Sequence, residues 1–213
     1  MKKISFITVS AVAFLLMTCV CFVDARAEGG AVVSQTTTLD NLMAAYNGEQ
    51  NANARYLAFA EKANEEGYDA AASLFRAAAI AEKVHYGRHA EMIMELGGTP
   101  KAVIEIPVVR STPENLESAF KGETYEKDVM YPAFILQAQK EGLKDAIDAF
   151  EDAAAAEGVH AELYSRMLKN LTLSKGLAKD FYVCPVCGNV VDAIIGSKCP
   201  ICFADTKKFM KVK

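Results

Sequence analysis

Glu82-Lys83-Val84-His85 and Glu157-Gly158-Val159-His160 are two copies of one pattern, Glu-x-x-His, and each lies in a long stretch with helical periodicity. Residues three positions apart lie on the same face of a helix, so each copy directs one carboxylate and one imidazole the same way. Two such pairs, joined by single glutamates from two more helices, form the ligand set of a dinuclear metal site in a four-helix bundle. The sequence therefore predicts an all-α fold for most of the chain.

The hydrophobic pattern predicts four helices with a long crossover between the second and the third. The expected helices start after the threonines at 36–38 and run to about residue 67, then cover 69–96, 112–142 and 144–173. Thr112 is expected to cap the third helix with Pro113 as its first helical residue, and Pro132 should kink it. The proline-containing segment 99–112 is too long for a hairpin and predicts a crossover between two helix pairs.

Each predicted apolar face is interrupted near its middle by glutamate, or by glutamate and histidine. These side chains are Glu49, Glu82, His85, Glu123, Glu126, Glu157 and His160. Five carboxylates buried together would be very costly without positive charge, and no lysine or arginine faces them unless Lys127 turns inward. Carboxylates combined with imidazoles suit iron or manganese, so the pattern predicts a dinuclear centre of that kind.

Three more residues accompany this set. His89 lies four positions after His85 on the same face, and we expect it to be a buried core histidine rather than a ligand. Tyr56 and Tyr131 lie near the glutamates in the sequence. Their hydroxyl groups are expected either to hydrogen-bond ligand carboxylates or to pack as ordinary core side chains.

A second metal site is predicted in the C-terminal tail. Two Cys-x-x-Cys pairs, Cys184 with Cys187 and Cys199 with Cys202, are separated by 11 residues. Four thiolates on two tight turns are typical of a tetrahedral iron or zinc site, and the spacing alone does not separate the two metals. So short a tail holds little core of its own, so a bound metal is expected to stabilise its fold.

The N-terminus has the features of an export signal. Lys2 and Lys3 precede an uncharged stretch from 4 to 23, and Ala25-Arg26-Ala27 resembles a signal-peptidase site. Residues 1–27 are thus predicted to be a cleaved signal peptide that directs the protein to the periplasm, the alternative being an uncleaved membrane anchor. The full chain of 213 residues carries a formal charge of −4, and removal of three cationic residues and Asp24 brings it to −6. This charge argues against nucleic acid as a partner.

Together these motifs resemble the rubrerythrin family, in which a ferritin-like di-iron bundle precedes a rubredoxin-like iron domain. The resemblance rests on the two Glu-x-x-His pairs, the two Cys-x-x-Cys pairs, Gly48-Glu49 with Arg55-Tyr56, and Gly122-Glu123-x-x-Glu126 with Met130-Tyr131-Pro132. It covers almost the whole chain after residue 27. It implies a ferritin-like bundle over residues 28–175 and a rubredoxin-like domain over residues 180–213.

The resemblance implies an iron-dependent peroxidase that reduces hydrogen peroxide to water. It implies that Glu82 and Glu157 bridge two irons and that Glu49 and Glu123 are terminal ligands. His160 would hold one iron, and the other would exchange between Glu126 when oxidised and His85 when reduced. The four-cysteine iron would pass electrons from an unidentified donor protein to this pair. The family also implies a head-to-tail homodimer, in which the tail of one subunit approaches the bundle of the other.

Three other functions are compatible with parts of the sequence. A ferritin-like ferroxidase or iron-handling protein would share the bundle and accumulate a mineral core. A manganese catalase-like enzyme would release oxygen from peroxide without a reductant. A non-enzymatic protein would use a structural zinc ribbon to present the bundle to a partner.

Overall fold

The structure, a computed structural model, describes residues 36–213. The predicted export signal over residues 1–27 lies outside the described residues. Within the described part of the chain, no helix is both long enough and apolar enough to span a membrane.

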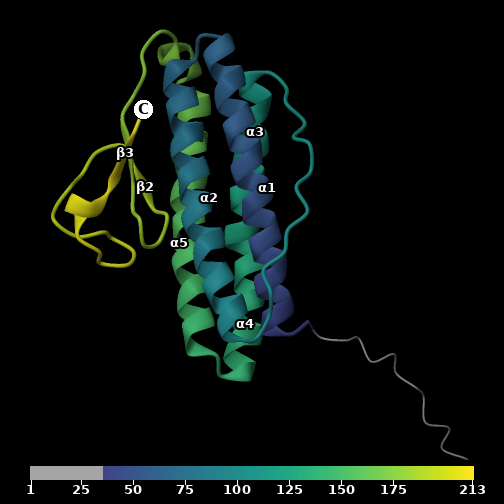
Figure 1. The fold of residues 1–213 in the computed structure, drawn as a ribbon. Helices are drawn as coiled ribbons and strands as arrows, with labels where there is room; N and C mark the ends of the chain where they lie inside the picture. Colours follow the sequence, from purple (N-terminus) through teal and green to yellow (C-terminus); the bar gives the residue numbers. More distant parts are fainter. Residues whose placement is uncertain (1–35) are drawn as a thin grey trace, which may run out of the picture. The chain divides into compact units, whose positions relative to one another are not determined.

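Four long helical segments run side by side and form the predicted bundle (Figure 1). Helix α1 covers Thr38–Glu65 and pairs with α2, Asp69–Glu95, to form the first hairpin. The third segment is α3, Thr112–Tyr125, followed by the π-helical turn η1, Glu126–Met130, and by α4, Tyr131–Glu141. Helix α5, Lys144–Lys169, packs against both α3 and α4. The expectation of a ferritin-like four-helix bundle is confirmed.

Local sequence explains where the helices begin, with one correction. Thr37 caps α1 in a reciprocal capping box with Asp40. The predicted cap at Thr112 is wrong by one residue, because Ser111 caps α3 and forms the same reciprocal arrangement with Glu114. Thr112 instead donates its backbone N–H to the Glu66 carboxylate over 2.8 Å. This contact ties the start of α3 to the end of α1.

Two predicted features of the later helices also need correction. The third segment does not simply kink at Pro132; it widens into the π turn η1 just before that residue, and the backbone N–H of Tyr131 bonds to the carbonyl of Glu126. Pro132 has no N–H to continue the regular ladder, and π turns of this kind often occur at functional sites. The last bundle helix ends at Lys169 rather than near Leu173, because Leu171–Ser174 forms the 3-10 turn η2.

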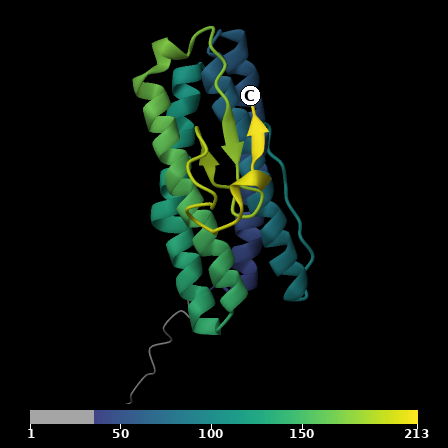
Figure 2. The same cartoon turned by 90° about the vertical axis from the view of Figure 1, so that its left-hand side faces the viewer.

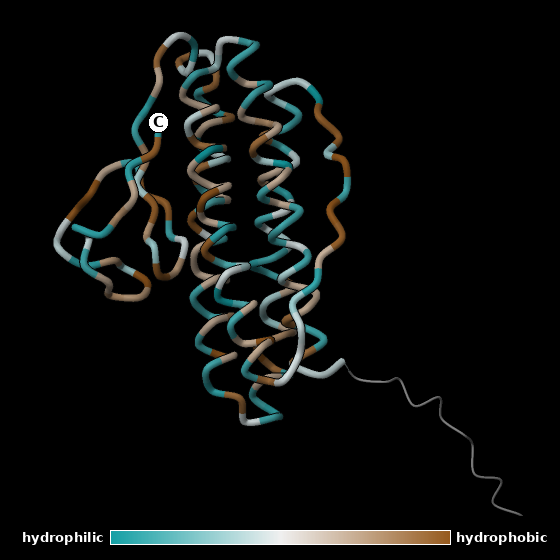
Figure 3. Tube along the Cα trace, viewed as in Figure 1, coloured by the Kyte–Doolittle hydropathy of each residue, from teal (hydrophilic) through white to brown (hydrophobic). Residues whose placement is uncertain are grey.

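The crossover runs along the outside of the bundle beside α1 (Figure 1). Two asparagines of α1 hold it there: Asn47 accepts the backbone N–H of Val103 over 2.8 Å, and Asn51 accepts that of Glu105 over 2.8 Å. Its β-branched side chains remain largely exposed, and the segment appears as a brown stretch in Figure 3. The crossover therefore connects the two helix pairs without contributing to the core.

Apolar side chains form two separate clusters along the bundle. One contains Tyr56, Phe59, Phe75 and Tyr164, and the other contains Tyr131 and Phe150 among its large side chains. On α1, α2 and α5, the predicted ligand glutamates lie between the residues of one cluster and the residues of the other. The polar layer is therefore enclosed on both sides by packed apolar layers, which exclude water from it.

The tail forms a three-stranded antiparallel sheet in the order β2-β1-β3, made of β1, Phe181–Val183, β2, Val190–Val191, and β3, Met210–Val212. A short 3-10 turn, η3, covers Thr206–Lys208. Figure 2 looks onto this part of the chain, which lies in front of the bundle. One side of the sheet packs into the bundle core, because Phe181, Val183, Val190 and Val212 join the cluster that contains Phe75 and Tyr164. The tail is too short to form a hydrophobic core of its own, and it packs against the core of the bundle instead.

Candidate metal centre

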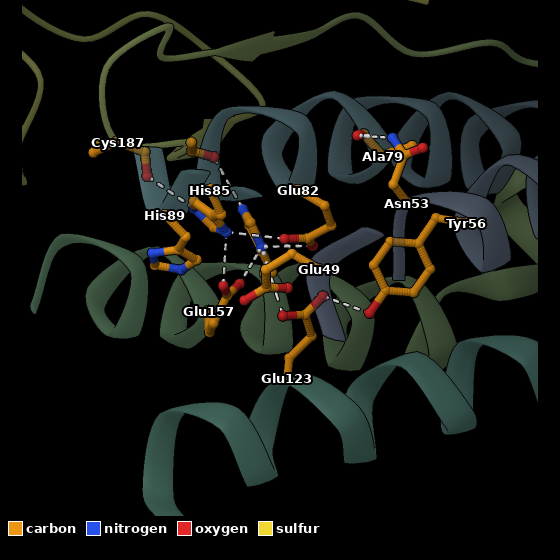
Figure 4. A network of polar contacts seen from close by, with 12 residues as sticks. Glu49, Asn53, Tyr56, Ala79, Glu82, His85, His89, Glu123, Glu157 and Cys187 are labelled. Atoms are coloured by element: carbon orange, nitrogen blue, oxygen red, sulfur yellow. Dashed lines mark hydrogen bonds and ion pairs between the residues drawn. The ribbon is translucent and has the colours of Figure 1, made fainter. Parts of the chain in front are cut away.

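The helices supply their ligand candidates at one level of the bundle (Figure 4). Glu49 comes from α1, Glu82 and His85 from α2, Glu123 from α3, and Glu157 and His160 from α5. All six are almost completely buried. The periodicity of the sequence therefore predicted correctly which side chains turn inward.

Both histidines turn the same ring nitrogen toward the carboxylates. Nδ1 of His85 lies 2.9 Å from an oxygen of Glu82 and 2.8 Å from one of Glu157. Nδ1 of His160 lies 2.8 Å from the other oxygen of Glu157. The two rings are stacked with their centroids 5.9 Å apart. The carboxylate oxygens and the two Nδ1 atoms thus converge on a common space.

The opposite ring nitrogens bind the tail. Nε2 of His85 lies 3.0 Å from the carbonyl oxygen of Cys187, and Nε2 of His160 lies 3.1 Å from that of Gly188. Since a carbonyl oxygen only accepts, each Nε2 carries the hydrogen and donates it. In the neutral imidazole, Nδ1 then has a free lone pair that faces the carboxylates, which is the tautomer that a metal ligand needs.

Sequence reasoning missed these two carbonyl partners. Every residue has a backbone carbonyl oxygen, so no sequence motif indicates which of them accepts a hydrogen bond. Gly188 was a usable signal, because the motif Cys-x-x-Cys-Gly places the residue without a side chain next to the carbonyls.

The ligand candidates form two groups, in each of which the donor atoms lie within 4.8 Å of one another. The first contains Glu49, Glu82, His85 and Glu157, and the second contains Glu82, Glu123, Glu157 and His160. Glu82 and Glu157 belong to both groups, the arrangement expected of carboxylates that bridge two metal ions. Glu126 is buried at the start of η1 but completes neither group. In this arrangement His85, and not Glu126, is a ligand candidate of the first group.

Electrostatics make this layer unfavourable without added positive charge. Burial, followed by the charges of neighbouring glutamates, raises the pKa of Glu49, Glu123 and Glu126 well above the ordinary value. Burial also acts on Glu157, but the charges of His85 and His160 outweigh it and hold the pKa of Glu157 well below normal. Lys127 does not turn inward, since its ammonium group pairs with Asp128.

Unpaired buried oxygens test whether this donor set fits metal ions. Glu49 Oε2, Glu82 Oε1 and Glu123 Oε2 are buried and have no hydrogen-bond partner among the described residues. An orphaned carboxylate oxygen in a dry interior is unfavourable, whereas the same atom is a good ligand for a divalent or trivalent cation. The donor set therefore fits two metal ions with carboxylate and imidazole ligands.

Two tyrosines hold the outer glutamates in place, as one of the sequence predictions required. Tyr56 donates its hydroxyl hydrogen to Glu123 over 2.7 Å, and Tyr131 donates to Glu49. His89 lies behind Tyr131, with Nε2 3.0 Å from the tyrosine oxygen, and burial lowers the pKa of His89 to about 3. His89 belongs to neither ligand group, so it stays a neutral core histidine in this arrangement.

The four tail cysteines form a second site, and none is in a disulfide. Their sulfurs lie 3.5 Å apart for Cys184 and Cys202, and 3.6 Å apart for Cys187 and Cys199. Metal–sulfur bonds of about 2.3 Å place the corners of a tetrahedron roughly 3.8 Å apart, so these separations suit one metal ion. A hydrogen bond from Cys187, together with backbone N–H groups, lowers the pKa of Cys184 to about 5, which favours a thiolate.

Comparison with known proteins gives these sites a family. The family model described as Rubrerythrin matches residues 40–168. The chain belongs to the rubrerythrin family. Nigerythrin of Nitratidesulfovibrio vulgaris is 41% identical over 174 residues, which cover 81% of this chain and 85% of that protein. Rubrerythrin-1 of Clostridium acetobutylicum is 34% identical over 177 residues, which cover 78% and 90%.

Solved structures agree with this assignment. Nigerythrin in its fully reduced, all-ferrous state aligns with a TM-score of 0.77 at 39% identity, covering 86% of this chain and 91% of that one. A bacterioferritin of Desulfovibrio desulfuricans, at 24% identity and a TM-score of 0.62, shares the fold of the bundle. The family, the donor sets and the all-ferrous relative identify iron as the cofactor of both sites. The protein is thus a rubrerythrin-type di-iron protein and an oxidoreductase.

Removal of iron is expected to reverse the pH dependence of stability. The pKa values of Glu49, Glu123, Glu126, His85 and His160 are raised, so in the folded apoprotein these five groups hold more protons than in the unfolded chain above about pH 4.5. They outnumber His89 and Cys184, whose lowered pKa values act in the opposite direction. Its free energy of unfolding should therefore fall as the pH rises from about 5.5 to 8. The slope is about 1.4 kcal/mol per pH unit for each proton that the folded protein holds in excess of the unfolded chain.

The iron-loaded protein is the control for this prediction. Protons compete with iron for the same oxygens and nitrogens, so its stability should fall toward acid pH instead. Thermal melts of both forms at several pH values measure the two slopes. Equal slopes would show that the buried carboxylates are already neutralised by something other than iron or protons.

Proposed function

We propose that this protein is a peroxidase that reduces hydrogen peroxide to water at the glutamate–histidine centre, using electrons relayed from the four-cysteine site. Each turnover consumes one peroxide, two electrons and two protons and yields two waters. When iron is bound, the paired site supplies two electrons together and the four-cysteine site carries them one at a time. The remaining work falls to the side chains of the chain.

The relay is supported by one observation above the others. His85 and His160 have Nδ1 among the ligand carboxylates and Nε2 on the carbonyls of Cys187 and Gly188. The covalent bonds of Cys187, one hydrogen bond and the imidazole ring of His85 therefore connect a ligand sulfur of one site with a ligand nitrogen of the other. A site for iron storage alone would have no use for such a connection.

The surrounding residues position the reactants and restrict access to them. Tyr56 and Tyr131 fix the carboxylates of Glu123 and Glu49, and the two apolar clusters keep bulk water out. A narrow cleft lined in part by Val84, Val186 and the ion-paired Arg88 and Asp152 reaches His85. The cleft has a volume of about 10 Å³, which is roughly the space of one water molecule, so it excludes a large oxidant and would have to widen to admit hydrogen peroxide.

We also infer three features that the residues suggest but that need separate tests. Exchange of one iron between Glu126 and His85 is supported by the burial of Glu126 and by the charges of Glu49 and Glu123, which act on it and help to raise its pKa. The export signal would direct the protein to the periplasm, or anchor it to the membrane if it is not cleaved. A head-to-tail homodimer would add a second route between the sites, although in the described chain the tail already contacts its own bundle.

Metal analysis combined with visible spectroscopy tests the proposed function. We expect about three irons per chain and a thiolate-to-iron absorption band. Dithionite should bleach this band, and hydrogen peroxide should restore it, with one peroxide consumed for every two electrons. Zinc in the tail, or bleaching without recovery, would contradict the relay. Release of oxygen from peroxide without a reductant would instead indicate a catalase, and a mineral core would indicate a ferroxidase.

A further inference from the structure

The two cysteine turns of the tail have the same construction. In the first, Cys184 N–H bonds to the carbonyl of Asn189 over 2.9 Å, and Gly188 N–H bonds to that of Cys184 over 3.1 Å. In the second, Cys199 N–H bonds to the carbonyl of Ala204 over 2.8 Å, and Phe203 N–H bonds to that of Cys199 over 3.1 Å. Gly188 and Phe203 therefore occupy equivalent positions.

This equivalent position requires a left-handed backbone. Gly188 has φ of +74° and Phe203 has φ of +61°. Glycine adopts this conformation readily, whereas a bulky residue is strained in it, and Phe203 is the only non-glycine residue with positive φ among residues 36–213. Strain of this kind often marks a functional position, so the aromatic side chain needs an explanation.

The two turns face opposite surroundings. Gly188 packs so closely on His85 that a Cβ atom there would lie 2.2 Å from Nε2. The Phe203 side chain is 72% exposed, and Cys202 beside it is the one cysteine of the four that is not fully buried. One turn therefore contacts the di-iron centre, while the other presents an aromatic ring and a partly accessible ligand to solvent.

Positive charge surrounds the outward turn. Residues 178–213 contain six lysines against three aspartates, a formal charge of +3, on a chain whose total charge is −4. Lys179 and Lys211 pair with Asp192 and Asp180. Lys198, Lys207 and Lys208 are exposed and have no ion-pair partner among the described residues. The backbone of Lys198 pairs with that of Asp205 at the base of the second turn, and Lys207 and Lys208 follow Asp205 in η3.

We propose that the outward turn, formed by Phe203 with Lys198, Lys207 and Lys208, is the docking surface for an acidic one-electron carrier protein that reduces the four-cysteine site. Exposed aromatic side chains are typical of the centres of protein interfaces, and complementary charge around them accelerates encounter. Figure 2 views the tail from the side that faces away from the bundle. This inference rests on the proposed relay and names the partner class that would feed it.

Flavodoxin, an acidic flavin protein, is the probe for this surface, and its reaction with the four-cysteine site balances in electrons and protons. An acidic flavodoxin in its anionic hydroquinone form gives one electron and becomes the neutral semiquinone, retaining its N5 proton. The four-cysteine site accepts that electron and passes from ferric to ferrous, so no proton is gained or lost. Two such encounters supply the electrons for one peroxide.

Charge reversal tests the surface. In the double variant Lys207→Glu/Lys208→Glu, stopped-flow reduction of the four-cysteine iron by flavodoxin hydroquinone should slow about 10-fold or more at low ionic strength. The affinity of oxidised flavodoxin for the zinc-loaded protein, measured by calorimetry, should fall in parallel. The matched variant Lys101→Glu/Lys140→Glu makes the same charge change on exposed residues of the bundle part and should leave both measurements within about twofold of the unmodified protein.

Phe203→Gly tests the aromatic side chain. Glycine suits this backbone as it does at position 188, so the variant should fold at least as stably while flavodoxin binds it about fivefold more weakly. Reduction by a photoreduced deazaflavin, which is too small to need a docking surface, should remain unchanged. A slower reduction by this small reductant would instead show that the substitution damages the four-cysteine iron site itself, and the docking role of Phe203 would be rejected.

Two results would overturn the proposal. One is unchanged flavodoxin kinetics and affinity in both the charge-reversed and the Phe203→Gly variants. The other is a change in sedimentation of Lys207→Glu/Lys208→Glu, which would identify this face as a contact between copies of the chain. Dithionite-driven peroxide reduction serves as an independent readout: if it persists while flavodoxin docking fails, the proposed peroxidase function stands and only the docking surface is wrong.

Discussion

Cys184→Ser is expected to abolish donor-driven peroxide turnover while leaving the di-iron centre loaded. Cys184 is a buried member of the four-sulfur site, and no other described side chain is available to replace its thiolate there. Mutation of a residue that hydrogen-bonds a metal ligand typically lowers metal affinity or activity by about 10–100-fold. Loss of a ligand itself should therefore lower turnover by about 100-fold or more. The ligands of the paired site all come from α1, α2, α3 and α5, so that site should still bind two irons.

The measurement separates the two sites within one protein. Metal analysis should fall from about three irons per chain to about two, and the thiolate-to-iron band should disappear. After chemical reduction, the variant should still consume one peroxide in a single turnover. Ser197→Ala, an exposed change in the same part of the chain, is the matched control and should keep all three irons. Undiminished steady-state turnover in Cys184→Ser would rule out the relay.

The ligand layer was predictable from sequence because each ligand breaks a strong pattern. Glu49 and Glu157 interrupt apolar faces whose spacing fixes their direction, and burial of several carboxylates has few physical explanations. The cysteine spacing was equally informative, since two tight turns that present four sulfurs have few other uses. Features that follow from local periodicity and from charge burial were therefore accessible without the structure.

Contacts between distant parts of the chain were not predictable in this way. No pattern indicates that Thr112 binds Glu66 rather than capping its helix, or that the carbonyl of Cys187 meets His85 across 102 positions. The backbone conformation of Phe203 was hidden too, because only the comparison with its twin at Gly188 shows that the position demands a left-handed residue. Tertiary packing decides the two long-range contacts, whereas the hydrogen bonds of its own turn decide the backbone conformation of Phe203.

Gly188→Ala is expected to slow electron transfer between the two sites without removing either. The added methyl group would lie 2.2 Å from His85 Nε2 and 3.1 Å from the backbone oxygen of Ala81, so the turn must move away from the bundle. This movement would break the hydrogen bonds from His85 and His160 to the tail. Displacements of about 1 Å at a reacting centre cost up to 100-fold in rate, so we expect a fall of about 10-fold or more.

A second glycine separates this effect from backbone strain. Gly196 has φ of +81° and nothing within 4 Å of its Cβ position, so Gly196→Ala carries the same left-handed penalty, roughly 1–2 kcal/mol, without a collision. Stopped-flow mixing of each fully reduced variant with peroxide resolves the two steps. Both variants should oxidise the paired site at the normal rate, but only Gly188→Ala should delay the return of the thiolate-to-iron band. An equal delay in both would assign the loss to strain, and no delay in either would mean that electrons do not pass through the turn at His85.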